Sequence, residues 1–145
     1  MIEDLRRRYP GAVTFRFGDS DAMNRQLIAL VRAGKKRATM GRLSDFGPGK
    51  EAKPVVGRCD IITQWDGTPA VVVRTVSVEE MPLNEISEDF ALAEGENETY
   101  GEWYDDHRAY FERNGGWAPD MMMICERFEV IEDLGDDPDA PGYVR

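Results

Sequence analysis

Two apolar runs separated by a tight turn constrain the fold of this chain more than any other feature. Residues 59–65 and 70–78 are rich in Val, Ile and Thr, and Asp66-Gly67 between them is a strong signal for a β-hairpin turn. The second run begins as a continuous apolar stretch and then alternates, until Met81-Pro82 is expected to break it. A hairpin joins antiparallel neighbours, so we expect a mostly antiparallel sheet rather than repeated β-α-β units.

Capping residues and apolar spacing predict the remaining elements. Strands are expected at residues 13–17, 38–43 and 121–131, and the Gly- and Pro-rich stretch 44–54 indicates a flexible flap. Helices are expected over residues 2–9, after Asp19 or Ser20 as far as Gly34, from Ser87 to Gly95, and from Thr99 to Asn114. The order predicts an α+β fold: a curled, mostly antiparallel sheet or open barrel with flanking helices.

Length and cysteine usage narrow the class of protein. With 145 residues the chain has the size of one domain. It has no run of about 18 apolar residues, and its N-terminus lacks an apolar stretch, so neither a membrane span nor a signal peptide is expected. Cys59 and Cys125 are expected to be reduced thiols inside strands rather than a disulfide framework. We therefore expect a cytoplasmic protein with no membrane partner.

Charge is strongly segregated along the chain. The formal net charge is −10, which argues against binding a long nucleic-acid duplex through many phosphates. Residues 31–58, however, contain eight Lys and Arg and two acidic residues, whereas residues 79–106 contain eleven acidic residues and no Lys or Arg. We expect the fold to bring these two segments together, which leaves room for a small, locally basic pocket.

Two short motifs carry candidate chemistry. In Gly34-Lys35-Lys36-Arg37-Ala38-Thr39 a turn would bring Lys36 and Thr39 together, whereas an immediate strand would place them on opposite faces. A Lys beside a Thr hydroxyl can act as base or electrostatic activator; the alternative is a solvated, cationic helix end. Likewise, Glu94 and Glu96 can pair with a cation, bind a metal or transfer protons, or they are simply part of a charged loop.

The expected helix after Thr99 carries an aromatic stripe. Trp103 and His107 share a face with Tyr110 or Phe111, at steps of four and three residues. An aromatic stripe of this kind belongs to a hydrophobic core more often than it forms a platform for stacking bases. A histidine within such a stripe is more often a packed, hydrogen-bonded residue than a catalytic one.

Several stretches in order resemble one known family, the ASCH domain family of the PUA-like superfamily. They are FGDSDAMNRQLIALVRAGKKRATMG, SEDFALAEGENETYGEWYDDHRAYF and MMMICERFEVI. The resemblance is closest to the small bacterial single-domain branch. It implies an ASCH domain over residues 17–132, with an N-terminal helix and strand extension at 1–16 and an acidic flexible tail at 133–145. It also implies a PUA-like barrel with a cleft beside the G-K-x-x-T element, suited to RNA or a modified nucleoside.

Some small ASCH proteins hydrolyse the acetyl amide of N4-acetylcytidine with a Lys, a Thr and a Glu. Carried over by motif, the resemblance implies that Lys36, Thr39 and Glu94 are catalytic. Thr39 would be the nucleophile, Lys36 its activator, and Glu94 would orient Lys36 or move the proton. Trp103 or Tyr104 would stack on the base, and no cofactor is required. The substrate-binding residues expected around them are Lys35, Arg37, Arg42, Glu96, Trp103, Tyr104 and His107.

Two other functions stay open at this point. One is an RNA-binding domain or a metal-dependent ribonuclease, in which residues 31–58 contact phosphates and Glu94, Glu96 and Glu126 hold a divalent metal. The other is a non-catalytic sensor of a nucleotide-like ligand. The expected partner is thus a modified nucleoside or short RNA, and the oligomeric state is left open.

Overall fold

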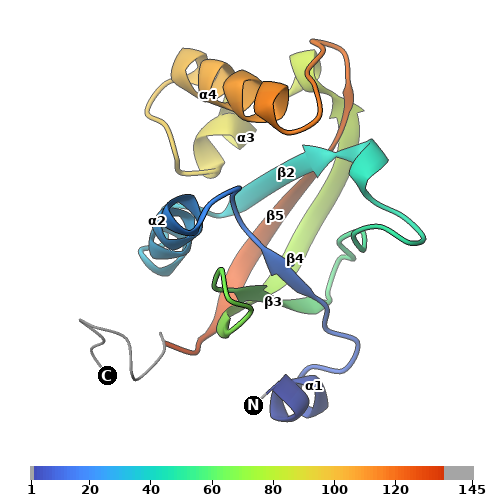
Figure 1. Cartoon of the computed structure of the whole chain (residues 1–145), viewed down its shortest axis with the longest axis vertical. Coiled ribbons are helices and arrows are strands. Elements are labelled where there is room, and N and C mark those ends of the chain that lie inside the picture. Colours follow the sequence, from blue (N-terminus) through green and yellow to red (C-terminus); the bar gives the residue numbers. More distant parts are fainter. Residues whose placement is uncertain (1, 136–145) are drawn as a thin grey trace.

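A computed structural model describes residues 2–135 of the chain (Figure 1). This range forms four α-helices and five strands, with two short 3-10 turns. In chain order they are α1 (Ile2–Arg8), β1 (Thr14–Arg16), α2 (Asp21–Arg32), β2 (Ala38–Arg42), η1 (Leu43–Asp45), β3 (Cys59–Thr63), β4 (Pro69–Pro82), η2 (Leu83–Glu85), α3 (Glu88–Ala93), α4 (Tyr100–Arg113) and β5 (Met122–Asp133). The flexible tail expected at 133–145 lies, from residue 136 onward, outside the described residues.

The five strands form one open sheet in the order β1-β3-β4-β5-β2. The hairpin expected around Asp66-Gly67 joins β3 to β4, and only the β1–β3 pair is parallel among the described strands. The mixed, mostly antiparallel sheet with flanking helices confirms the α+β expectation. Strand β1, part of the N-terminal extension expected at 1–16, pairs with β3 and so belongs to this sheet.

Strand β4 is longer than expected. The sequence predicts that Met81-Pro82 breaks it, which is wrong: Met81 pairs with Met123 and Pro82 with Met122 of β5. The pairing of β4 with β3 ends at Arg74, so the later part of β4 is bonded on one side only. A proline, which lacks an N–H, is tolerated at such an edge.

Side-chain caps start three of the helices where the sequence predicts them. The hydroxyls of Ser20, Ser87 and Thr99 accept hydrogen bonds from the backbone N–H three residues ahead, at 3.2, 3.1 and 3.2 Å. Of the two residues expected to cap α2, Ser20 is the cap, whereas Asp19 binds Arg113 at the end of α4. These caps fix where α2, α3 and α4 leave the sheet.

The helices cover different parts of the sheet (Figure 1). Helices α3 and α4 lie together over one end, where the fully buried Trp103 packs with Ala38, Met123 and other apolar residues. Helix α2 packs on the middle of the sheet through Leu27 and Val31, and α1 lies at the opposite end from α4. No helix within residues 2–135 has the length and apolar character needed to cross a bilayer.

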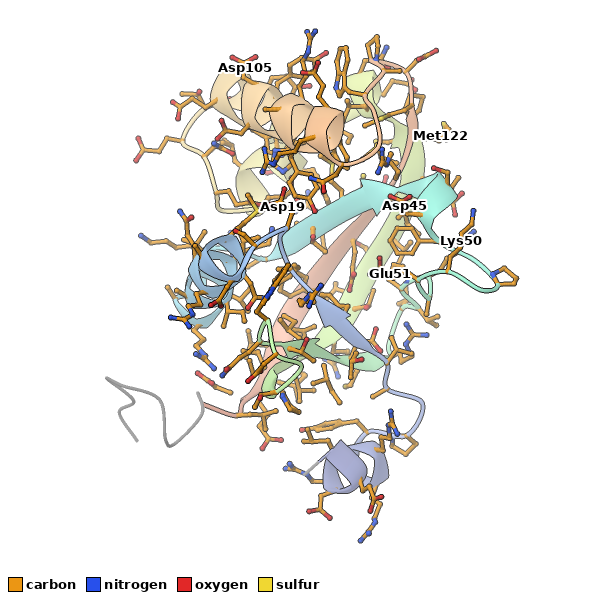
Figure 2. The ribbon with its side chains drawn as sticks, viewed as in Figure 1. Asp19, Asp45, Lys50, Glu51, Asp105 and Met122 are labelled. Atoms are coloured by element: carbon orange, nitrogen blue, oxygen red, sulfur yellow. The ribbon has the colours of Figure 1, made fainter. Side chains whose placement is uncertain are left out.

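The stretch expected to be a flap continues from the end of β2 through η1 into a turn (Figure 2, where Asp45, Lys50 and Glu51 are labelled). Its turn is closed by a bond from Gly47 N to Glu51 O at 3.0 Å, and Lys50 Nζ donates to Ser44 O at 2.7 Å. The Phe46 ring lies against Gly41 of β2, where a Cβ would stand only 2.8 Å from the ring. The missing side chain at Gly41 thus lets this loop approach the strand, while its flexibility stays a prediction.

Candidate functional site

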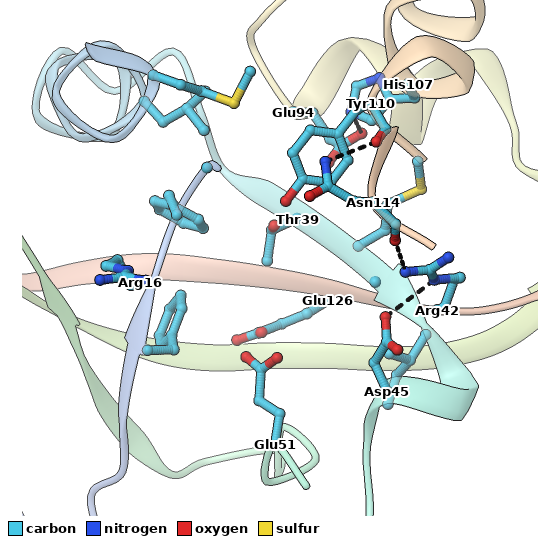
Figure 3. A pocket seen from close by; sticks show the side chains of 18 of the residues that line it. Arg16, Thr39, Arg42, Asp45, Glu51, Glu94, His107, Tyr110, Asn114 and Glu126 are labelled. Carbon is cyan, nitrogen blue, oxygen red and sulfur yellow. Dashed lines mark hydrogen bonds and ion pairs between the residues drawn. The ribbon is translucent and has the colours of Figure 1, made fainter. Parts of the chain in front are cut away.

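A cavity of about 690 Å³ opens between helices α2 and α4, strands β1 and β2, and the loop after β2 (Figure 3). Its volume is in the range typical of small-molecule sites. Six of the ten residues expected to form the site line it: Lys36, Thr39, Arg42, Glu94, Glu96 and, from helix α4, His107.

Lys36 is almost completely buried, at 1% exposure. Helix α2 ends at this point because Gly34 adopts a left-handed φ of 76° and the N–H groups of Lys35 and Lys36 both turn back to Leu30 O. The Lys36 ammonium donates to Glu96 Oε2 at 2.8 Å, to Ala38 O at 3.0 Å and to Glu94 O at 3.4 Å. All three hydrogens of the ammonium group are therefore engaged.

Glu94 is the second buried charged group, at 2% exposure. Its Oε1 lies 3.8 Å from Lys36 Nζ, and its Oε2 accepts a hydrogen bond from Trp103 Nε1. Burial raises the pKa of Glu94, although Lys36 and His107 act in the opposite direction. A carboxyl group with a raised pKa is a better proton acceptor than an exposed one, which suits a role in proton transfer.

His107 completes the group. Its Nδ1 lies 2.7 Å from Trp103 O, and because a carbonyl only accepts, Nδ1 carries a hydrogen. Its Nε2 faces Glu94 Oε2 at 3.3 Å and Glu96 Oε2 at 3.9 Å. Each of the two carboxylates therefore lies within 4 Å of both Lys36 and His107.

Gly95 makes this convergence possible. It adopts a left-handed φ of 72°, and a Cβ there would collide with the backbone of Lys35 and Lys36. The close approach is reinforced by a bond from Arg37 N to Ala93 O at 2.8 Å. The end of α3 therefore lies directly on the Lys36 backbone, with Glu94 and Glu96 on either side of Gly95.

We predict that Gly95→Ala lowers the free energy of unfolding by about 3 kcal/mol or more, because both the backbone angle and the contact must change. Urea denaturation measures this. Gly101→Ala is the matched control: a Cβ at Gly101 meets nothing within 4 Å, and the residue lies in helix α4. The control is expected to be neutral or stabilising by up to about 1 kcal/mol. Equal losses for the two variants would contradict the role given to Gly95.

Thr39 lies on β2 with its side chain directed into the cavity (Figure 3). Lys36 precedes the strand, which begins at Ala38, and both residues line the same cavity. Among residues 2–135 no group forms a hydrogen bond with the Thr39 hydroxyl, and Lys36 binds Ala38 O instead. The hydroxyl is thus available to a ligand.

Three of the basic residues expected to bind the substrate are placed differently from the expectation. Lys35 and Arg37 are exposed and do not line the cavity. The Arg42 guanidinium binds Gly116 O at 2.9 Å, Asn114 O, and Asp45 at 3.1 Å. It ties β2 to the end of α4, and these bonds occupy three of its five N–H donors.

The two residues expected to stack on a base do not reach the cavity. Trp103 is fully buried, with ring centroids of Tyr100 and His107 at 5.3 and 5.0 Å, and Tyr104 packs edge-on against Trp117. The helical period identifies the stripe, but the apolar side of α4 faces the core. The Trp103 indole instead serves as a donor to Glu94.

Other aromatic residues line the cavity in their place. Phe15 and Phe17 follow β1 at alternate positions, with ring centroids 5.3 Å apart, and Tyr110 comes from α4. Phe46 adds a further ring from the loop. The alternation at residues 15 and 17 is visible in the sequence, but it indicates only a strand face and not a cavity.

The metal set expected for a ribonuclease is not brought together. Among residues 2–135, the group with ligand atoms within 4.8 Å of one another is Glu94, Glu96 and His107, without Glu126. Lys36 Nζ already lies 2.8 Å from Glu96 and 3.8 Å from Glu94, where a bound cation would stand. These residues therefore hold an ammonium group of the chain itself and do not fit a divalent ion without displacing it.

The open mixed sheet, with a cavity beside the α2–β2 junction, defines a PUA-like domain. The model of the ASCH domain family matches residues 13–132, so the chain belongs to the ASCH domain family. No curated protein sequence matches the chain.

Solved structures agree with this assignment. A protein from Enterococcus faecalis V583 is 33% identical with a TM-score of 0.75, over 90% of this chain and 85% of that one. An ASCH domain from Lactobacillus crispatus is 28% identical with the same TM-score, over 88% and 84%. An ASCH protein from Zymomonas mobilis is 10% identical with a TM-score of 0.50, over 85% and 73%, and shows a likeness of fold alone.

Proposed function

We propose that this chain is a hydrolase that cleaves the acyl amide of a modified nucleoside, with N4-acetylcytidine as the model substrate. The observation that carries the proposal is a buried Lys36 ammonium, fixed between Glu94 and Glu96, at a cavity that also presents the unbonded Thr39 hydroxyl. A buried cation and an unbonded nucleophile in one concave site are the parts that acyl transfer requires.

In the proposed reaction Thr39 Oγ attacks the acyl carbonyl. The Lys36 ammonium gives one proton to Glu94, whose raised pKa suits it as acceptor, and takes up the Thr39 hydroxyl proton in its place. It exchanges its contact with Ala38 O for the developing oxyanion, which its positive charge stabilises. The proton then moves to the leaving exocyclic nitrogen, which departs as a free amine. Water releases the acyl group from Thr39 as a carboxylic acid, so that the net reaction is amide hydrolysis. No metal is needed, because Lys36 supplies the positive charge.

Aromatic side chains support a nucleobase as the ligand. Phe15 of β1 and Tyr110 of α4 both line the cavity, and aromatic rings of this kind are the groups on which a planar base stacks. Among the residues that line the cavity, seven are acidic and four are Lys or Arg, so the formal charge of the lining is negative. An acidic lining disfavours phosphates, so a nucleoside fits better than a nucleotide.

The basic segment 31–58 offers little support for an RNA track. Most of its cations bind acidic groups of the same chain, including Lys36 with Glu96, Lys53 with Glu80 and Arg58 with Asp60. The first two of these pairs join the basic and the acidic segments, as expected from their charges. Lys35 and Arg37 stay exposed near the site, where they can meet a phosphate of a longer substrate.

Incubation of purified protein with N4-acetylcytidine tests the proposal. We expect cytidine and acetate in equal amounts, resolved by chromatography, at a rate that chelation of divalent metals leaves unchanged. Intact substrate after incubation with folded protein would contradict the function, and loss of activity with a chelator would contradict the metal-free mechanism.

A further inference from the structure

A second buried carboxyl group lines the cavity apart from the Lys36 cluster. Glu126 of β5 is 8% exposed, and Figure 3 shows its carboxyl directed into the cavity, with Thr39 on one side and Glu51 on the other. Its Oε2 accepts a hydrogen bond of 2.7 Å from the Thr75 hydroxyl. Among the described residues, no group bonds Oε1. The reaction outlined above does not use this group.

The register of the sheet places Glu126 beside the proposed nucleophile. Thr39 of β2 and Glu126 of β5 are directly opposite in the antiparallel pair, so their side chains lie on the same face of the sheet. Opposite Cβ atoms in such pairs are about 5 Å apart. A ligand whose reacting carbon lies at Thr39 therefore has its neighbouring polar atoms within reach of Glu126.

We propose that Glu126 determines which nucleobase the cavity accepts, through a hydrogen bond from its free Oε1 to a ring acceptor next to the exocyclic nitrogen. The proposal rests on the function proposed above and names the part of the ligand that is recognised. Cytosine carries such an acceptor, the ring nitrogen N3, beside its exocyclic N4. Uracil carries an N–H at this ring position, so its N–H and the O–H of Glu126, both donors, would face each other.

The surroundings favour a protonated carboxyl at this position. Burial raises the pKa of Glu126 to about 7, and the carboxylates of Asp60 on β3 and Glu51 on the loop act in the same direction. Arg58 and the Thr75 hydrogen bond oppose them. Arg58 is bound to Asp60 at 2.8 and 3.0 Å. Because Thr75 donates to Oε2, the proton of the neutral acid lies on Oε1, toward the cavity.

Binding of cytidine, measured by calorimetry between pH 6 and pH 9, tests the inference. Cytidine stays neutral over this range, so a change reports on the protein. If only the protonated form binds, affinity falls as pH rises through the pKa of Glu126, by roughly 50-fold from pH 7 to pH 9. Glu126→Gln keeps an acceptor for Thr75 and a donor for the ligand, and it is expected to bind with a flat pH profile. Uridine should bind weakly throughout.

Two variants complete the design. Glu126→Ala is expected to bind at least tenfold more weakly than wild type at pH 6 and to show a flat pH profile. Glu129→Gln, on the same strand but exposed and paired with Arg74, is expected to keep the wild-type profile. Failure of folded Glu126→Gln to bind, a flat wild-type profile, or no cytidine binding at all would overturn the inference. If the protein hydrolyses N4-acetylcytidine but its binding of cytidine does not depend on pH, only the inference about Glu126 is overturned. If cytidine binding depends on pH but no hydrolysis occurs, only the proposed function is overturned.

Discussion

Lys36→Met is expected to abolish hydrolysis of N4-acetylcytidine and to lower the free energy of unfolding by about 3–5 kcal/mol. Methionine fills nearly the same volume but removes the ammonium, which leaves Glu94 buried and without its cation. Breaking a buried ion pair from one side carries a cost of this size. Hydrolysis should fall by at least about 10³-fold, because both the oxyanion contact and the proton path are lost.

The double variant Lys36→Met/Glu94→Gln separates the two effects. Glutamine keeps an acceptor for the Trp103 indole but carries no charge, so most of the lost stability should return. Activity should not return. Denaturation curves and product formation, measured on all four proteins of the cycle, give both answers. A double variant as active as wild type would remove Lys36 from the reaction, and one as unstable as the single variant would contradict the ion-pair argument.

Thr39→Val is expected to remove hydrolysis while leaving the fold intact. Valine is isosteric and well suited to a strand, and the hydroxyl it replaces has no hydrogen-bond partner among residues 2–135. Turnover should fall by at least about 10³-fold, whereas the midpoint of urea denaturation should change little.

Thr39→Ser provides the matched control. Serine keeps the nucleophilic oxygen and is expected to retain measurable turnover. With this variant an acyl-enzyme intermediate can be sought by mass spectrometry of the intact protein after rapid quenching. Equal activity of the Val and Ser variants would exclude Thr39 as the nucleophile and leave a directly attacking water.

Local signals in the sequence predict most of the fold. The Asp66-Gly67 turn and the caps at Ser20, Ser87 and Thr99 each act within a few residues, so they are readable without the tertiary structure. The end of β4 is the exception. Whether Pro82 breaks a strand depends on which neighbours pair with it, and that is set by the distant strand β5.

The candidate site is less predictable for the same reason. The motifs place Lys36 and Glu94 on the correct elements, but their contact depends on Gly95 fitting against the Lys36 backbone. Helical spacing groups Trp103 with His107, yet it does not say whether that face meets the core or the cavity. The role of Glu126 depends on the register between β2 and β5, which no short motif encodes.

That register also has an evolutionary consequence. Because Thr39 and Glu126 are cross-strand neighbours about 87 residues apart in the chain, a substitution at one position changes the surroundings of the other. Within the family the two positions are therefore expected to diversify as a pair when the ligand changes. Engineering a new specificity should begin with joint libraries at these two positions, because neither is independent of the other.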